Sequence, residues 1–304
     1  MHSQIEEITF GVELETTIPA AAQLRVGHYH AGLPVNVARA GERLLPAPTF
    51  LGVAWKSERD GSIRVTKPGQ VACEFVSPIL KGEAGVRHLV EFVEWLRAIG
   101  AQVNASCGMH IHIGASSAAG GEELTAYVER LTRLVAFNSK ALYAQTGTIT
   151  REKGVYCAPL GDQTKRAIAR VKRTKRLGDA GIAGRYHILN LTTLNTRGTV
   201  EFRCFAGTVN TTKVLLHLFS ALALAIIARK AKTPAQWSNG PLSGTKAVTN
   251  FLKVRPMARI VGSPFLADRF PQMLAKAVEL AGKYDTQQAA LDVILLTRTT
   301  RSAA

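Results

Sequence analysis

The stretch Cys107–Gly114, with the sequence CGMHIHIG, decides the expected fold because apolar and polar residues alternate along it. Apolar residues fall at every second position from Met109 to Ile113, and His110 and His112 stand between them. Successive side chains of a strand point to opposite faces of its sheet. The alternation therefore predicts a strand with one apolar face and one polar face.

Two further stretches show the same alternation with a polar pair. In TFGVELET (9–16) the pair is Glu13 and Glu15, and in TVEFRCF (199–205) it is Glu201 and Arg203. Residues two apart on a strand lie on one face, about 6.6 Å from each other. Helices would cover the apolar face of such a sheet. The opposite, concave face would collect carboxylates, imidazoles and a guanidinium.

Each pair alone also has an ordinary structural explanation. An ExE pair is typical of the solvated face of a half-buried sheet, and an ExR pair is typical of a weak cross-strand ion pair. An HxH pair is as consistent with polar strand residues as with metal ligands. The prediction of a site rests on the three pairs occurring together.

A fourth strand, in CEFVSP (73–78), adds Glu74 to the expected polar face. Glu13, Glu15, Glu74 and Glu201 on one face would repel each other unless divalent cations neutralised them. Several oxygen ligands with an imidazole suit Mg²⁺ or Mn²⁺ better than a tetrahedral zinc site. The sequence therefore predicts a Mg²⁺ or Mn²⁺ centre on this face.

The rest of the chain predicts an α+β fold with a mostly antiparallel sheet, because strands come in runs with helices between them. The expected strands are Glu6–Glu15, Gly52–Lys56, Ser62–Thr66, Val71–Ser77, Gln102–Asn104, Met109–Gly114, Tyr186–Leu191 and Gly198–Phe205. The expected helices, from apolar residues at three- and four-residue spacing, are Glu83–Ile99, Glu122–Ala144, Thr211–Ala231, Leu266–Ala281 and Thr286–Leu296. Thr211–Ala231 is apolar nearly all round, which predicts a buried helix.

Two segments lack a period and mark divisions of the chain. Arg25–Thr49 indicates an irregular insertion, and Lys232–Lys246, rich in Pro and Gly, indicates a linker. We expect a catalytic domain over residues 1–231, followed by a linker and a C-terminal helical appendage over residues 232–304.

The composition excludes several classes of protein. The chain has 304 residues, 46% of them hydrophobic and 20% charged, which excludes disorder, collagen-like repeats and a coiled coil. The longest apolar run, Val214–Ala228, falls short of the roughly 20 residues that span a bilayer. The first residues are polar and acidic, unlike a signal peptide, and the four cysteines form no CxxC pair. We expect a cytoplasmic protein with no membrane contact, no disulfide framework and no zinc knuckle.

The chain carries a formal net charge of +16, which indicates an anionic partner. Ten basic residues fall between Arg151 and Arg185. One interpretation is a solvated loop, and another is a lid that nucleotide or acidic substrate draws over the site. A third is a docking surface for a larger anion. Arg151 and Arg185, at the ends of the segment, are the residues expected to contact phosphate or carboxylate.

Taken in order, the motifs GVELE, DGS, EFVSP, CGMHIHIG, RYHILNL and TVEFRCF resemble the amidoligase family. This family belongs to the carboxylate–amine ligase superfamily of glutamine synthetase and glutamate–cysteine ligase. The resemblance spans about residues 8–231 and implies a fold like the glutamine synthetase catalytic domain. The sequence departs from glutamine synthetase in having one Glu in the 74 region instead of two, and in lacking that enzyme's ammonia-site loops.

The resemblance implies a role for each polar residue. Glu13, His110 and Glu201 would hold the metal that bridges the nucleotide phosphates, and Glu15 and Glu74 a second metal facing the acyl phosphate. His112 would lie near the ATP phosphates, and Arg203 would stabilise the transferring γ-phosphoryl group. The catalytic set would then be Arg203, Glu201 and Glu15. Asp60 and Ser62 of DGS could reach the amine, although Asp-Gly-Ser is also a plain turn sequence.

The predicted function is an ATP- and metal-dependent ligase that joins an acidic carboxylate substrate to an amine through an acyl phosphate. The amine could be a small molecule, a peptide or a protein. A carboxylate needs such activation, and the chain contains neither a P-loop nor GxGxxG. One alternative is a phosphotransferase with the same nucleotide site. Another is a basic nucleic-acid-binding protein, which ranks lower because only Tyr156 and Tyr186 lie near the basic segment as stacking aromatics.

Overall fold

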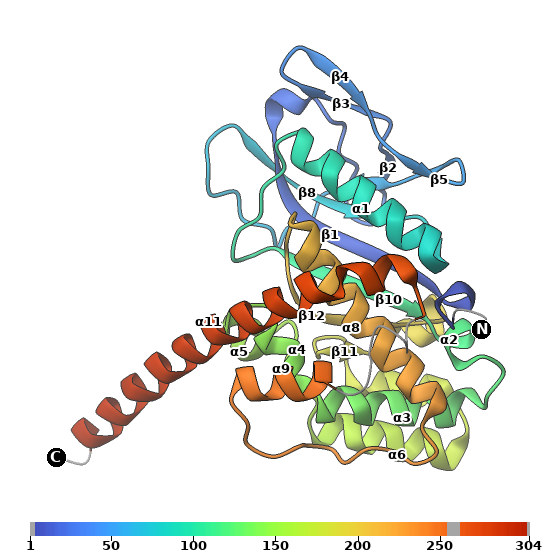
Figure 1. Cartoon of the computed structure of the whole chain (residues 1–304), viewed down its shortest axis with the longest axis vertical. Coiled ribbons are helices and arrows are strands. Elements are labelled where there is room, and N and C mark those ends of the chain that lie inside the picture. The colour runs from blue at the N-terminus through green and yellow to red at the C-terminus, as the bar shows by residue number, and fades with distance from the viewer. Residues whose placement is uncertain (1–3, 254–261, 303–304) are drawn as a thin grey trace.

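The centre of the fold is one eight-stranded antiparallel sheet (Figure 1). The computed structural model describes residues 4–253 and 262–302. The four central strands are β12 (Thr199–Ala206), β10 (Gly108–Gly114), β1 (Thr9–Pro19) and β8 (Gln70–Val76), in that spatial order. The edges are β11 (Leu189–Asn190) on one side, β7 (Lys56–Glu58) and β2 (Leu33–Pro34) on the other, and β9 (Leu80–Lys81), which pairs with β1. The predicted α+β fold with a mostly antiparallel sheet is confirmed.

The pairing register brings the polar residues of neighbouring strands together. Glu13 of β1 lies opposite His110 of β10, and Glu15 of β1 lies opposite Glu74 of β8. On the other side of β10, His112 lies opposite Glu201 of β12. Because residues opposite each other in a ladder share a face, the polar pairs of three strands form one polar face of the sheet.

Helices cover the apolar face, as predicted. Helix α1 (Gly82–Ala98) lies across β1 and β8 in Figure 1, and α8 (Thr211–Lys230) packs against both α1 and β10. Helix α3 (Leu124–Phe137) packs on α8. The core between these helices and the sheet contains fully buried side chains such as Phe92, Ile111 and Phe202.

Helix α8 is longer than the apolar run that the sequence analysis considered. Among the described residues it is the one helix whose length and composition would suffice to cross a membrane. Most of it is buried inside the protein, against α1, α3 and β10. Its burial, rather than its length, therefore marks it as a core helix.

Several short elements connect the layers. They are η1 (Gln4–Glu7), η2 (Ala20–Ala22), β3 (Val37–Ala40), β4 (Arg43–Pro46), β5 (Thr49–Phe50), β6 (Val53–Ala54), α2 (Ala115–Ala119), α4 (Ser139–Ala144), α5 (Thr150–Lys153), α6 (Asp162–Thr174), η3 (Leu177–Ala183), α7 (Thr193–Thr196) and α9 (Gly244–Lys253). The expected irregular insertion thus contains a hairpin, β3–β4.

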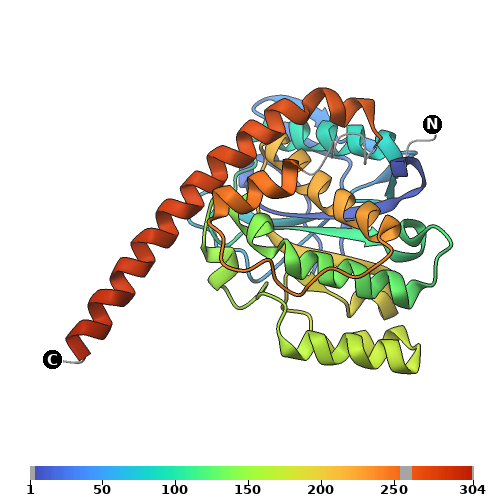
Figure 2. The same ribbon diagram turned by 60° about the horizontal axis from the view of Figure 1, so that its bottom comes forward.

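The structure differs from the expected elements at several places. Residues 102–104 form no strand, only an isolated bridge between Gln102 and Thr17, and the strand expected over 52–56 is divided between β6 and β7. Residues 62–66 form no strand, because Arg64 bonds through its backbone to side chains of a neighbouring loop instead of to a ladder. The single expected helix over 122–144 is divided into α3 and α4 at Asn138, whose side-chain amide donates to the Leu134 carbonyl. The two expected C-terminal helices form one helix, α11 (Pro264–Ser302), whose last part extends away from the body in both views (Figures 1 and 2).

The basic segment 151–185 is folded rather than a loop. Helix α6 lies on the outside of the molecule, beyond α3 (Figure 2), and buries Ala167, Ile168 and Val171. Ion pairs join its C-terminal end to α3, where Lys172 lies 3.6 Å from Glu129. Helix α9 packs against α4, and α11 packs against α4, α8 and α9. The division at residue 231 stays a prediction.

Candidate active site

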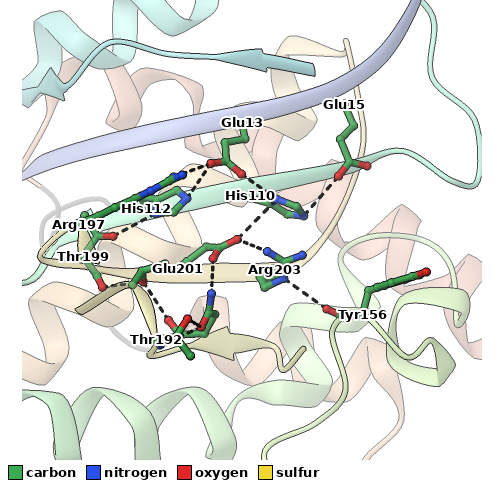
Figure 3. Close-up of polar contacts among 12 residues, drawn as sticks. Glu13, Glu15, His110, His112, Tyr156, Thr192, Arg197, Thr199, Glu201 and Arg203 are labelled. Atoms are coloured by element: carbon green, nitrogen blue, oxygen red, sulfur yellow. Dashed lines mark hydrogen bonds and ion pairs between the residues drawn. The ribbon is translucent and has the colours of Figure 1, made fainter. Parts of the chain in front are cut away.

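A row of carboxylates and imidazoles crosses the polar face from β1 to β12 (Figure 3). His110 is at its centre: its Nδ1 lies 3.1 Å from Oε2 of Glu13 and 3.6 Å from Oε1 of Glu201, and its Nε2 lies 3.7 Å from Oε1 of Glu15. Nε2 of His112 lies 3.2 Å from Oε1 of Glu13. The i, i+2 spacing on each strand, combined with the register, puts these five side chains within contact distance.

Glu201 is held on both of its carboxylate oxygens. Oε1 pairs with Nη1 of Arg203 at 2.5 Å, and Oε2 accepts a hydrogen bond from the side-chain amide of Asn190 at 2.6 Å. All three side chains are buried. Because both contacts fix the carboxylate plane, Glu201 and Arg203 present a preorganised negative and positive group side by side.

Crowding of the carboxylates shifts their pKa values in opposite directions. Burial alone would raise the pKa of Glu13, but hydrogen bonds and charge from His110 and His112 hold it well below its usual range. Burial, together with the charges of Glu13, Glu15, Asp60 and Glu58, raises the pKa of Glu74 to about 9. The face therefore carries more carboxylates than it can ionise without added positive charge.

The donor set fits divalent cations of the Mg²⁺ or Mn²⁺ type. Three groups each bring possible ligand atoms within 4.8 Å of one another: Glu13, His112 and Glu201; Glu13, Glu74 and His110; and Glu15, Asp60 and Glu74. Most of these ligand atoms are carboxylate oxygens, which hard cations prefer. The buried Nε2 of His112 also has no hydrogen-bond partner among the described residues, although it lies close to Glu13.

Three cavities adjoin this row. The central one, of about 680 Å³, lies over Glu13, Glu74, His110 and Glu201. A second, of about 620 Å³, lies at the Glu15 end, and a third, mostly apolar and of about 520 Å³, lies at the His112 end. The site is thus the middle of a groove with one polar and one apolar extension.

The two arginines at the ends of the basic segment both reach the groove. Nη2 of Arg151 donates to the backbone carbonyl of Arg203 at 2.6 Å, next to Glu15. Arg185 lines both the central cavity and the one at the Glu15 end. Every residue selected from the sequence for this site therefore lies on the walls of these cavities, while the individual roles stay predictions.

Four groove residues lie outside the set selected as metal ligands, catalytic residues or cofactor contacts. Asn190 and Glu58 stand on the short edge strands β11 and β7, and Arg197 pairs with Glu13 at 3.0 Å from a loop. Asp60 accepts a hydrogen bond from the Ser62 backbone, as in a turn, and also reaches Glu15 and Glu74. In the sequence, Asn190 appeared only within the RYHILNL motif and Asp60 only within the DGS turn.

The groove thus brings carboxylates, imidazoles and arginines together on one face of the sheet. A sequence model of the family described as "Putative amidoligase enzyme" matches residues 6–225, which is most of the chain. The chain therefore belongs to this amidoligase family, and its membership indicates a function of the ligase type.

Comparison with solved structures found a distant likeness to a crystal structure described as a novel glutamine synthase homolog. The two share 14% sequence identity at a TM-score of 0.37, over 94% of this chain and 69% of that chain. Comparison with curated protein sequences gave no match.

Proposed function

We propose that the protein is an ATP-dependent carboxylate–amine ligase that forms an amide through an acyl phosphate. The observation that carries the proposal is the buried Glu201–Arg203 pair beside His110, in a groove lined by further carboxylates. Membership of the amidoligase family supports the same reaction class.

The reaction has two group transfers. A carboxylate oxygen of the acid attacks the γ-phosphorus of ATP, the bond to the β-phosphate oxygen breaks, and ADP leaves. The amine nitrogen then attacks the acyl carbon, the C–O bond to phosphate breaks, and amide, inorganic phosphate and a proton result. Charge neutralisation and positioning are the main demands that phosphoryl transfer places on a protein.

The groove residues divide between these demands. Glu13, His110, His112 and Glu201 on one side, and Glu15, Glu74 and Asp60 on the other, would hold divalent cations. Bound cations would supply charge neutralisation for the phosphates. Arg203, fixed by Glu201, would contact the γ-phosphoryl group, and His110, hydrogen-bonded to Glu13, would keep that carboxylate in place.

The apolar extension of the groove suits the base and ribose of the nucleotide. It is lined by Phe10, Val76, Pro78 and Ile79, and the Ile79 side chain is 78% exposed. Arg197 lines both this cavity and the central one, where a phosphate would pass between them. ATP placed in this way points its γ-phosphate at Glu201 and Arg203.

The test measures ADP release with Mg²⁺, ATP and a panel of acids, with hydroxylamine added to trap an acyl phosphate as a hydroxamate. We expect Glu201→Gln to reduce turnover by about 100-fold, because an amide cannot replace the charge of a buried carboxylate at this position. Glu123→Gln, at an exposed carboxylate that pairs with Lys175, is the matched control and keeps full turnover. Normal turnover in Glu201→Gln at saturating Mg²⁺ would refute the proposal.

A further inference from the structure

Three exposed tyrosines surround the mouth of the cavity at the Glu15 end. Tyr29, Tyr156 and Tyr186 are 52%, 56% and 47% exposed, and all three line this cavity. The chain has six tyrosines, and the other three are fully buried. Exposed aromatic rings gathered at one place mark a binding surface, because large rings are otherwise buried.

The rings come from separate parts of the chain, and two of them contact each other. Tyr156 and Tyr186 contact each other edge to face, with ring centroids 5.6 Å apart. The guanidinium of Arg185 lies 5.2 Å from the Tyr186 ring centroid, and Tyr29 lines the same cavity. Figure 3 shows Tyr156 on the Arg203 side of the carboxylate row. Tyrosine side chains give a large amphipathic contact area at a low entropic cost, because each has only two rotatable side-chain bonds.

The same mouth also carries cationic groups for an anion. Arg64 is exposed at its rim, and its side chain has no partner among the described residues. Its backbone is held firmly, since Arg64 N–H donates to Oγ of Ser106 and its carbonyl accepts from Asn104. Arg64 thus lines this cavity and not the central one, whereas Arg185 lines both, and Arg203 would contact the reacting group.

We infer that the acid substrate is an anionic peptide, with a second carboxylate held by Arg64 and Arg185 and its chain lying on the three tyrosines. This rests on the proposed function. A single amino acid would place its carboxylates on the arginines but leave the three tyrosines uncovered, whereas a cavity of about 620 Å³ takes a molecule of several residues. Arginine matches a carboxylate with two parallel hydrogen bonds, which favours an acidic peptide over a neutral one.

The experiment compares L-glutamate, the tripeptide Ala-Ala-Glu and its C-terminal amide in ADP release by the full chain. We expect the KM for Ala-Ala-Glu to be at least about 10-fold below that for L-glutamate, since buried aromatic and arginine contacts dominate such interfaces. In the double variant Tyr156→Ala/Tyr186→Ala, the ratio of the KM for L-glutamate to the KM for Ala-Ala-Glu falls toward one. The double variant Tyr156→Phe/Tyr186→Phe retains the ratio of the unchanged protein. Arg64→Ala raises the KM for Ala-Ala-Glu more than the KM for its C-terminal amide, because the amide lacks the second carboxylate.

Val155→Ala is the matched control, because Val155 is 74% exposed next to Tyr156 and does not line the cavity. A KM for L-glutamate equal to or below that for the tripeptide would overturn the inference, as would equal effects of the tyrosine variants on both acids. Tighter binding of an N-acetylglucosamine trimer than of Ala-Ala-Glu would also overturn the inference, because the tyrosine surface would then prefer a neutral sugar to an anionic peptide.

Equilibrium dialysis of labelled Ala-Ala-Glu, without ATP, separates this inference from the proposed function. Binding that is lost in the tyrosine variant, without ADP release from any acid, would refute the ligase and retain the peptide site. ADP release with L-glutamate, but no tripeptide binding, would retain the ligase and refute the peptide site.

Discussion

The backbone N–H of Gly108 donates a hydrogen bond to Oε2 of Glu15 at 2.5 Å, across the pair of strands β1 and β10. Glu15 is thereby hydrogen-bonded to the main chain through Oε2, while its Oε1 lies 3.7 Å from Nε2 of His110. A Cβ at position 108 would stand 3.1 Å from Nη2 of Arg151, 3.2 Å from Nε2 of His110 and 3.3 Å from Oε2 of Glu15. A methyl group at this position would require these three side chains to move by a few tenths of an ångström.

Gly108→Ala should therefore reduce turnover by about 10-fold or more, because small displacements of positioned groups are costly in catalysis. The melting temperature should change little, since the new methyl meets the ends of side chains rather than the core. Gly161→Ala, where a Cβ meets nothing within 4 Å, is the control. Turnover equal to that of the control would show that the Glu15–Arg151 spacing is not critical.

Arg197 should contribute to nucleotide affinity. Its Nη1 lies 3.0 Å from Oε1 of Glu13, and its half-exposed side chain lines the boundary of the central and apolar cavities. We expect Arg197→Ala to raise the KM for ATP by about 10-fold, as loss of one charge-assisted contact does. Arg229→Ala, which removes a surface pair with Glu7, should leave it unchanged. Equal KM values for both variants would contradict the placement of the phosphates.

Cation binding should release a proton at neutral pH. The surrounding carboxylates and burial raise the pKa of Glu74 to about 9, so it is protonated at pH 7 in the metal-free protein. A divalent cation at the face would lower that pKa and expel about one proton. Calorimetric titration with Mg²⁺ in two buffers of different ionisation enthalpy measures this release. Heats that do not depend on the buffer, or an unchanged release in Glu74→Gln, would contradict it.

Stability should fall with acid through a histidine outside the groove. His217 is fully buried on α8 and stacked on Phe205, and burial, with the charge of Lys213, lowers its pKa to about 3. An unfolded histidine titrates near about pH 6.5, so between these values the unfolded chain binds the additional proton. The stabilisation by the neutral imidazole is complete above about pH 6.5 and is lost as the pH falls toward 3.

Urea unfolding of the protein and of His217→Gln at several pH values measures this contribution. Between pH 6 and 4 the free energy of unfolding should fall more steeply for the unchanged protein than for His217→Gln. The difference in slope is up to about 1.4 kcal/mol per pH unit for one proton. Parallel curves for the two proteins would show that another group controls the acid sensitivity.

The segment 151–185 should become less accessible when substrates bind. Its ends contact the groove through Arg151 and Arg185, whereas α6 between them carries exposed lysines and arginines that trypsin can cut. Mg²⁺, ATP and acid together should slow cutting within this segment and leave cutting in the linker 232–246 unchanged. Equal rates with and without substrates would favour a docking surface for a larger anion over a lid.

The sequence predicted the polar face because alternation fixes which residues of a strand share a face, whatever the neighbours of that strand are. It did not predict that Glu13 would lie opposite His110, or His112 opposite Glu201, because register depends on the whole sheet. Asn190 and Glu58 were missed because their strands have two and three residues, too short to show a period. Residues 62–66 have strand-like composition, but their backbone bonds to Asn104 and Ser106, which only the tertiary structure reveals.

Tyr29, Asp60, His110, Arg185 and Arg203 line both the central cavity and the cavity at the Glu15 end, so the two cavities share a wall. An occupant of one cavity that moves or orders this wall changes the free energy of filling the other. Thermodynamic linkage requires the effect to be mutual: the factor by which nucleotide tightens the acid is the factor by which the acid tightens nucleotide. The shared wall therefore predicts that the proposed affinities for nucleotide and for acid are coupled, so that each would have a defined value only at a stated concentration of the other ligand.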